Sequence, residues 1–302
     1  MSGLGAWTWE VDGWIVAIGA LAGLACCIPG SWLVARREAM MADALSHAVL
    51  PGIAIAFLAT GSRAPGWMLL GAMAAAAALA GISTWLRAAG RLERGAALGV
   101  TYTTLFAIGV LLASGAAREV DIDPSCVLFG SLEVAPLDAV AIGGTFVPRA
   151  ALLMCAVFAA NLALAALLWR PMLAASFDRA HARACGVRAG AMDAAVAAMA
   201  AATCVACFEA VGSILVIAIM VTPAVTARLC CGSLRAMAAV AAAVGAIGAL
   251  AGHVMATTVP MLAGLGAWGI TDASTSGSIA AALGGLLVLV AVTRACIRRM
   301  MG

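Results

Sequence analysis

Asp43 and His47 stand four positions apart in a segment that leads directly into an apolar stretch. On a helix, positions i and i+4 lie on the same face, so the two side chains can point the same way. They offer a hard carboxylate oxygen and an imidazole nitrogen, which together suit a borderline divalent cation such as zinc, manganese or iron(II). An ionisable residue inside a membrane-spanning segment is costly and is a candidate functional residue by default. The pair is therefore a candidate metal site.

A structural interpretation of the same pair stays open. Asp43 could cap the start of a helix, and His47 could bond to a backbone carbonyl. Pro51 and Gly52 follow shortly after the pair, and we expect them to break the helix, because proline lacks a backbone N–H. Broken helices in membranes expose carbonyls that can coordinate ions, which favours a transport pathway.

For the other chemically active side chains in apolar stretches, a structural interpretation is at least as strong as a functional one. His253 is a candidate metal ligand, but a hydrogen-bonded core histidine is the more frequent case. Glu209 lies between two apolar segments, where it could line the access to a pathway or simply reach the interface. Cys204 and Cys207 form a C-x-x-C pair with no second ligand pair nearby, so we interpret them as small buried hydrophobes.

The segment 176–188 is the longest polar stretch that we expect on the cytoplasmic side. Asp178 can cap a short helix within it, and Gly186 can end that helix. A short helix lying on the membrane surface suits docking into a partner protein. We interpret His181 as a surface contact rather than a metal ligand.

The composition indicates a polytopic membrane protein built as one domain, residues 1–302. The chain is 65% hydrophobic and only 10% charged, whereas a soluble domain averages about 25% charged residues. All 17 basic residues are Arg, which excludes a Walker A loop because that loop needs a Lys. If ATP drives the protein, another polypeptide carries the nucleotide site. No basic stretch precedes the first apolar run, so we expect that run to remain as a membrane anchor.

About nine stretches approach the roughly 20 apolar residues that a bilayer requires. The range is eight to ten, because two short stretches abut at Glu209 and could be one span plus a re-entrant piece. With the N-terminus outside and the C-terminus inside, 14 of the 17 Arg fall on the cytoplasmic side, as the positive-inside rule favours. The expected spans are 14–35, 45–60, 66–86, 97–114, 150–169, 191–208, 210–227, 236–257 and 279–297.

The stretch 125–147 does not fit a span, because counting it as one would invert every later loop. It contains Pro136, Asp138 and the pair Gly143–Gly144. We expect a short outer or re-entrant helix with a loop, which a membrane protein tolerates only where protein or water covers it.

Five stretches, in this order along the chain, resemble the permease subunits of ATP-driven manganese, zinc and iron importers. The first is DALSHAVLPG at 43–52, and the second is LFGSL at 128–132. The segment 177–186 resembles the family's coupling segment. The last two are EAVGSILVIA at 209–218 and TPAVTARL at 222–229. Together these landmarks are specific, although each alone is a weak signal.

The resemblance implies a helical permease dimer of the vitamin-importer type in the bacterial plasma membrane. Two permeases, as identical or related chains, would sit on two ABC ATPase subunits and receive the ion from an extracytoplasmic metal-binding protein. The chain itself would be neither an enzyme nor a nucleic-acid binder and would hold no resident cofactor; lipid surrounds it. Asp43 and His47 would contact the metal. The docking residues would be Phe177, Asp178, His181, Arg183 and Gly186.

Three other functions compete with this one. A relative could import a different cargo, such as a metal chelate or a cofactor, although the small Asp/His pair favours a bare ion. An ion-driven secondary transporter predicts internal repeats and more membrane acids than this sequence carries. An intramembrane metalloprotease needs H-E-x-x-H, which is absent. Asp and His serve manganese, zinc and iron alike, so the sequence does not choose among them.

Overall fold

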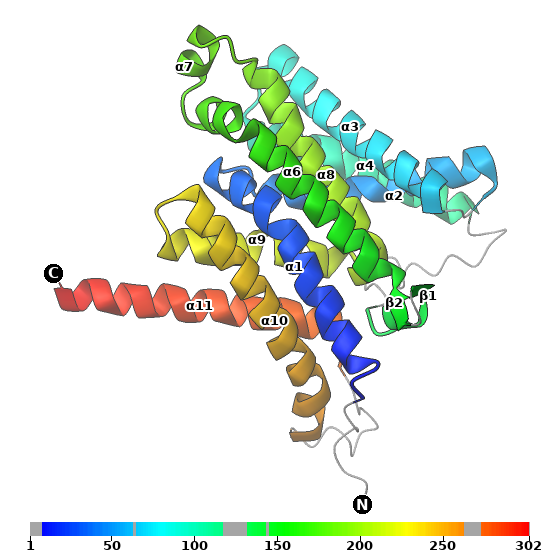
Figure 1. Ribbon diagram of the computed structural model, residues 1–302. Helices are drawn as coiled ribbons and strands as arrows, with labels where there is room; N and C mark the ends of the chain where they lie inside the picture. The colour runs from blue at the N-terminus through cyan, green and yellow to red at the C-terminus, as the bar shows by residue number, and fades with distance from the viewer. Residues whose placement is uncertain (1–7, 63–64, 117–131, 143–144, 263–272, 302) are drawn as a thin grey trace, which may run out of the picture.

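Ten α-helices and a two-stranded sheet form the parts of the chain that the structure, a computed structural model, describes: residues 8–62, 65–116, 132–142, 145–262 and 273–301 (Figure 1). In this described part nine helices, all but α7, are long and apolar enough to cross a membrane, which confirms the predicted spans. The helices are α1 Asp12–Ala35, α2 Met40–Thr60, α3 Pro65–Gly90, α4 Arg94–Ala116, α6 Arg149–Phe177, α7 Arg179–Ala184, α8 Ala189–Val211, α9 Ser213–Cys230, α10 Leu234–Leu262 and α11 Thr275–Met301.

The junction between α8 and α9 lies at Gly212, three residues beyond the expected position at Glu209. Gly212 has φ +82° and ψ 164°, a conformation that is essentially restricted to glycine. The chain therefore leaves one helix and enters the next within a single residue. Both helices are among the candidate spans, which favours two spans over the alternative of one span plus a re-entrant piece.

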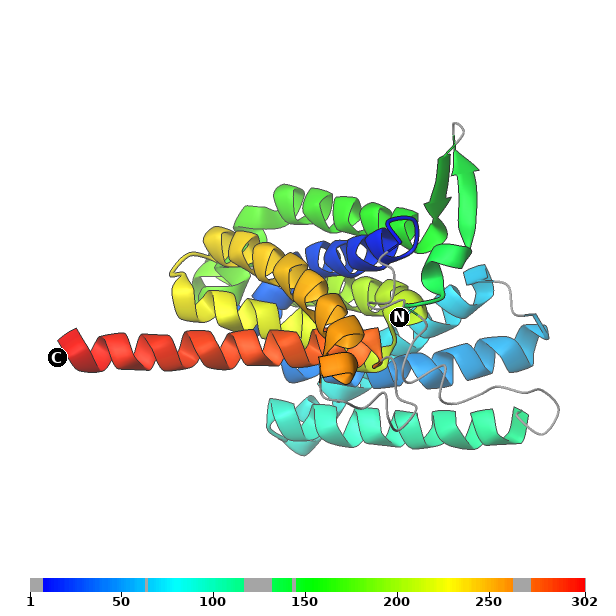
Figure 2. The same cartoon turned by 90° about the horizontal axis from the view of Figure 1, so that it is seen from below.

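A β-hairpin occupies part of the stretch where the sequence suggested a short helix. A single 3-10 turn, Ala135–Leu137, precedes the antiparallel strands β1 Ala139–Ile142 and β2 Thr145–Pro148. The helix prediction is wrong for this part, because Gly143–Gly144 between two short apolar runs is a hairpin signal. The remainder of the predicted segment, residues 125–131, lies outside the described residues. In Figure 2 the hairpin projects away from the helical bundle.

The spanning helices form two groups that α8 connects. In the first group α1 packs against α6, α8, α9 and α10, and α11 packs on α9 and α10. In the second group α2, α3 and α4 pack on one another, while α8 contacts both α2 and α3 (Figures 1 and 2). Val49, Ala72, Val205 and Phe208 form a small apolar cluster between the groups. The segment that carries the candidate metal pair is thus a neighbour of α8.

Helix α1 lies at the centre of the first group, and a side chain from another helix donates to a backbone carbonyl that α1 leaves without a helical donor. Pro29 within α1 has no N–H, so it cannot donate to the carbonyl of Ala25 four residues earlier. The side-chain amide of the buried Asn161 in α6 donates to that carbonyl at 3.1 Å and to the hydroxyl of Thr203 in α8 at 2.7 Å. One polar side chain therefore joins three helices.

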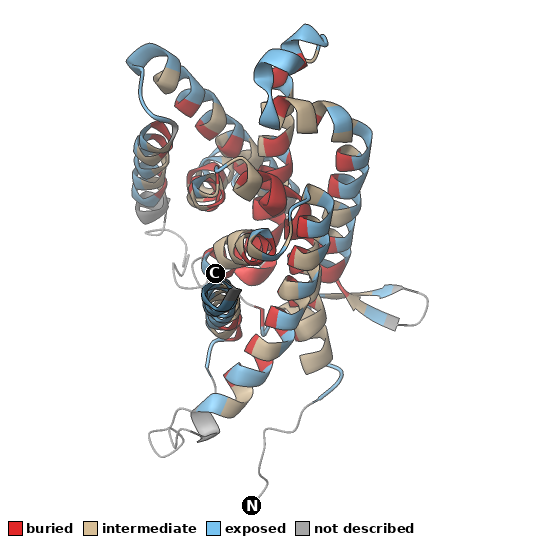
Figure 3. Cartoon of the chain, turned by 90° about the vertical axis from the view of Figure 1, so that its left-hand side faces the viewer, coloured by how far each residue is buried: buried red, intermediate tan, exposed pale blue. Residues whose placement is uncertain are grey.

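The surface of the bundle is apolar, as a lipid-facing surface must be. Figure 3 shows buried residues gathered inside the bundle and exposed residues on its outer faces. Leu111 of α4 and Leu167 of α6 are 71% and 79% exposed. Contact of these apolar side chains with water is unfavourable, so the bilayer is the solvent that suits this surface.

Candidate functional site

Asp43 and His47 lie on one face of α2, as their spacing predicts. Nε2 of His47 is 3.4 Å from Oδ1 of Asp43, and both side chains are about one-third exposed. The imidazole ring is held by two aromatic rings of α4: it stacks on Tyr102 at 5.8 Å between centroids and meets Phe106 edge-on at 5.0 Å. The pair is therefore oriented, partly accessible and backed by aromatic packing.

Capping does not explain Asp43. Helix α2 begins at Met40, and the residue before it, Ala39, makes no side-chain cap. Asp43 lies within the first turn, where its backbone carbonyl accepts a bond of 2.8 Å from the hydroxyl of Ser46. The carboxylate instead faces His47. The capping interpretation is therefore wrong.

The predicted break at Pro51 and Gly52 is also wrong, because α2 continues as a helix to Thr60. A side chain at Gly52 would collide with the backbone of Gly71 in α3, and Pro51 fits against Gly109 of α4. The two residues therefore allow close packing of α2 on its neighbours. Pro51 cannot donate to the carbonyl of His47, so that oxygen loses its usual helical partner beside the candidate pair.

One copy of the chain supplies only part of a coordination shell. Among the described residues, no group of three or more His, Cys, Asp or Glu side chains is placed to hold a metal ion. A structural or catalytic zinc takes four ligands or three plus a water. Asp43 and His47 alone would therefore leave a cation to complete its shell with water, carbonyl oxygens or a second copy.

The structure does not bring His253 to this pair. His253 is buried in α10, where its Nε2 is 3.0 Å from Oδ1 of Asp12 at the start of α1. Asp43 instead follows the other end of α1, a 24-residue helix that is roughly 36 Å long. The contact supports the interpretation of His253 as a core histidine that joins two helices. The side chain of Glu209 lies outside the described residues.

The expected docking segment forms the predicted short helix. In α7 the carboxylate of Asp178 accepts a bond of 2.9 Å from the backbone N–H of His181, which is the capping contact. The segment ends at Gly186, which has φ +77°. Phe177 is 65% exposed, a large apolar side chain at the tip of the molecule next to charged residues. Arg183 is also exposed.

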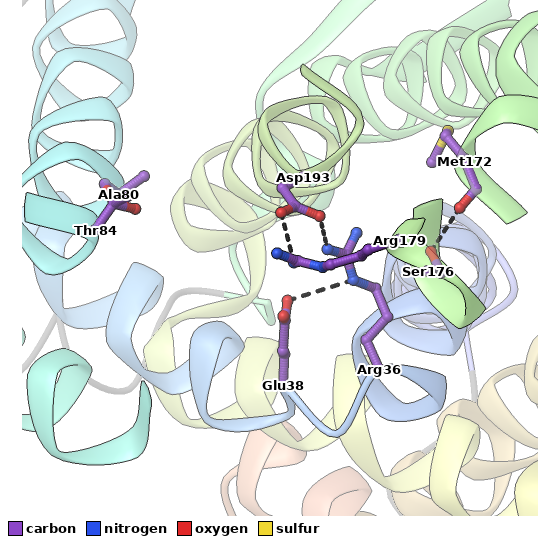
Figure 4. A network of polar contacts seen from close by, with 8 residues as sticks. All are labelled: Arg36, Glu38, Ala80, Thr84, Met172, Ser176, Arg179 and Asp193. Atoms are coloured by element: carbon purple, nitrogen blue, oxygen red, sulfur yellow. Dashed lines mark hydrogen bonds and ion pairs between the residues drawn. The ribbon is translucent and has the colours of Figure 1, made fainter. Parts of the chain in front are cut away.

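A network of ion pairs joins this segment to the start of α2, and sequence reasoning missed it. Figure 4 shows Asp193 of α8 between Arg179 of α7 and Arg36, which follows α1. Arg179 approaches Asp193 at 2.7 Å, while Arg36 pairs with Asp193 and lies 3.7 Å from Glu38. Arg36 and Glu38 are nearly buried, with 5% and 8% exposure. In the sequence, the only signal of this network is Asp193, a single acid near the start of an apolar span.

A cavity of about 1520 Å³ opens beside the network, between α3 and α8. Its lining has an excess of positive charge, since the acids Glu38 and Asp193 are outnumbered by arginines and already pair with Arg36 or Arg179. A basic rim of this kind suits an acidic protein surface. The arginines are Arg87, Arg91, Arg179, Arg183 and Arg188.

Comparison with known proteins identifies the family. The pattern of the ABC 3 transport family matches residues 11–292. The chain belongs to the ABC 3 transport family. Among the family landmarks seen in the sequence, 128–131 lie outside the described residues, and Leu132 is buried.

Curated relatives of this ABC 3 protein are named for several metals. The manganese transport system membrane protein MntD of Bacillus subtilis is 36% identical over 219 residues, which are 72% of this chain and 74% of MntD. The zinc transport system membrane protein TroD of Treponema pallidum is 32% identical over 69% of this chain and 57% of TroD. The chelated iron transport system membrane protein YfeC of Yersinia pestis is 30% identical over 70% of this chain and 66% of YfeC.

A solved structure supports the fold of this ABC 3 protein along nearly its whole length. PsaBC from Streptococcus pneumoniae in complex with Fab superposes with a TM-score of 0.73 at 23% identity, over 92% of this chain and 90% of the other. Together with the nine apolar helices of the described part, family membership makes the chain a multi-pass protein of the bacterial plasma membrane.

Proposed function

We propose that the chain is the membrane-spanning permease of an ATP-driven importer of a divalent metal cation, and that Asp43 and His47 contact the ion in transit. The observation that carries the proposal is the pair itself. A carboxylate and an imidazole approach to 3.4 Å on one helix face and are partly accessible, in a chain of the ABC 3 transport family. That ligand set suits manganese, zinc or iron(II).

Two copies of the chain, or this chain and a related permease, would complete the site. A dimer that places the pairs near a shared axis supplies two carboxylates and two imidazoles. The site need only be modest in affinity, because conduction requires that the ion can also leave. The partial shell in one copy and the partial exposure of both side chains support this arrangement.

ATP hydrolysis takes place on a separate subunit. The absence of lysine removes the Walker A loop from this chain, and ABC 3 relatives are named as membrane proteins of transport systems. The exposed segment of α7, with Phe177 at its edge and the basic cavity beside it, is the surface that we assign to the ATPase. With α7 in the cytoplasm the N-terminus is outside, where an extracytoplasmic metal-binding protein delivers the ion.

The ion pairs of Asp193 provide a route from the ATPase to the metal pair. Movement of α7 would pull Asp193 through Arg179, and Asp193 also holds Arg36 at the turn that begins α2. A change at the docking surface then reaches the helix of Asp43 through charged contacts rather than through soft apolar packing. The permease alternates between states that differ in these contacts.

The test replaces the pair with neutral residues of similar shape. Asp43→Asn and His47→Gln should each lower uptake of radioactive manganese or zinc by about tenfold or more, the usual minimum for damage to a metal shell. Uptake and metal-stimulated ATP hydrolysis are measured in vesicles that also contain the ATPase and the binding protein.

The chain offers a matched control in its second Asp–His pair. Asp12→Asn and His253→Gln alter an equivalent contact of 3.0 Å at the other end of α1. These two variants should lower the amount of folded protein, but each folded molecule should take up metal at close to the normal rate. If uptake is normal in both α2 variants, Asp43 and His47 are not in the pathway. If instead the His253 variant alone abolishes uptake, the ion passes elsewhere.

A further inference from the structure

Sulfur atoms from three helices meet in the interior of the bundle. Sγ of Cys26 in α1 lies 4.0 Å from Sγ of Cys207 in α8, and Sγ of Cys207 lies 3.4 Å from Sδ of Met154 in α6. Nearby on α8, Sγ of Cys204 is 3.9 Å from Sδ of Met220 in α9. All five residues are at most 1% exposed. We call Cys26, Cys207 and Met154 the sulfur cluster.

The fold corrects the sequence interpretation of the C-x-x-C pair. In sequence, Cys204 and Cys207 have no further ligands nearby, but the packing of α1 and α6 on α8 supplies a second thiol and a thioether. Cys26 and Cys207 are free thiols, so the cluster is not a disulfide. Two thiols and a thioether gathered from three helices can form a ligand set that none of the helices contains alone.

The spacing of the cluster is that of ligands around one ion. A metal–sulfur bond of about 2.3 Å places two sulfur ligands of one ion about 3.8 Å apart in a tetrahedron and about 4.0 Å apart in a trigonal plane. The Cys26–Cys207 separation of 4.0 Å equals the trigonal value, and the Cys207–Met154 separation of 3.4 Å is slightly shorter than the tetrahedral value. Neither separation requires the helices to move. The separations of Cys207 from each of its two neighbours therefore suit one shared ion after small side-chain rotations.

The chemistry of the cluster selects a soft ion of low charge. Thiolate and thioether ligands favour Cu(I) over harder cations. A buried site also penalises net charge. If Cys207 gives up one proton to water and forms a metal–sulfur bond, a monovalent ion leaves the site neutral. A divalent ion would require both thiols to be deprotonated and commonly four ligands, which the cluster lacks.

We propose that the sulfur cluster binds one soft monovalent cation, Cu(I) or Ag(I), at a site separate from Asp43 and His47. The bound ion ties α1, α6 and α8 together. Sγ of Cys204, one turn from Cys207, lies 3.9 Å from the carbonyl oxygen of Ala42, directly before Asp43. If Asp43 lies in the transport path as proposed above, an ion held here also slows import, because it fixes the helix packed behind that path.

Binding is tested with Ag(I), which needs no reductant, on the purified full chain. The background variant keeps the four cysteines that the structure shows to be buried and replaces the other six with Ser. After gel filtration this background should retain about one silver per chain, and silver should raise its unfolding temperature. The replaced cysteines are Cys126, Cys155, Cys185, Cys230, Cys231 and Cys296.

The ligand variants are Cys26→Ser, Cys207→Ser and Met154→Leu. Each Ser variant should lose the retained silver, and the volume-conserving Leu variant should bind silver at least about tenfold more weakly. The matched control is Cys27→Ser. Cys27 is buried next to Cys26 but points about 100° away around α1, so this variant should retain its silver.

Two outcomes overturn the proposal. One is equal silver retention in the background and in both Cys26→Ser and Cys207→Ser. The other is an equal loss in Cys27→Ser, which would make the silver a ligand of buried thiols in general. If the Ser variants fail to fold, Met154→Leu provides the test. An unchanged affinity of that variant for silver would show that the cluster is not the binding site. None of these readouts depends on metal import.

Discussion

A single polar side chain inside this bundle supports the backbone of another helix. Asn161 occupies the point where Pro29 leaves the carbonyl of Ala25 without a helical donor, and it also bonds to Thr203. An unsatisfied buried carbonyl costs more than an ordinary hydrogen bond contributes. Asn161 therefore offsets a defect that proline introduces into the most central helix.

We expect Asn161→Leu to lower the free energy of unfolding by about 1–3 kcal/mol, because it leaves the carbonyl of Ala25 unpaired. Pro29→Ala should reduce that cost, since alanine restores the helical donor. Unfolding of the four proteins of this double-mutant cycle is measured in one detergent. Strictly additive costs of the two substitutions would show that Asn161 and Pro29 are not coupled.

At this scale the sequence predicts what depends on local spacing. Asp43 and His47 share a face because four residues make one helical turn, and Asp178 caps α7 because its position precedes a short polar helix. The partners of His253 and Cys207 could not be predicted in the same way. Asp12 and Cys26 reach them only through the packing of α1.

Among the elements, α8 joins the two helix groups and carries Asp193. Asp193 pairs with Arg179 of α7 and with Arg36 at the turn before α2. The same helix therefore contacts the docking segment at its start and the sulfur cluster near its end. Such a helix can transmit a displacement as a rigid rod.

Asp193→Asn should separate ATP hydrolysis from import, because an amide of the same shape cannot pair with two guanidinium groups. We expect the metal imported per ATP hydrolysed to fall about fivefold or more, the low end of typical coupling between sites. Uptake and hydrolysis are measured on the same vesicles. The control is Asp138→Asn, which removes an exposed pair with Arg149 at the hairpin. An unchanged ratio in Asp193→Asn would exclude this route.

The elements themselves were predictable to the extent that their signals are local. Nine apolar runs and the distribution of arginines indicate the spans directly. The course of α2 through Pro51 was not predictable, because the close approach of α3 and α4 determines whether the helix continues there. The junction at Gly212 depends on the conformation of one glycine, and the pairing of strands 139–142 and 145–148 follows a turn signal; a hydropathy pattern reveals neither.

For the whole molecule, the exposed end at α7 is the surface that we propose as the docking site of the ATPase. Phe177 is 65% exposed at the end of α6, directly before the polar residues of α7. Large aromatic side chains of this kind supply much of the binding energy in protein interfaces.

Phe177→Ala should weaken binding of the ATPase by about 2 kcal/mol, as loss of an interface anchor does. Co-purification of the ATPase with the permease measures the effect. Leu167→Ala is the control, since Leu167 is 79% exposed but lies within a membrane span. Equal retention of the ATPase by both variants would place the docking surface elsewhere.

Helix α1 is synthesised long before α10, the helix with which it makes its most extensive contact. Until Leu234 and the residues after it are made, the face of α1 around Gly23 lacks its tightest contact, which is with the backbone of Gly245. Domains otherwise tend to fold from the N-terminus during synthesis. A ribosome that stops before α10 therefore releases a chain in which α1 is only partly packed, and incompletely packed chains of this kind are substrates for cellular proteases.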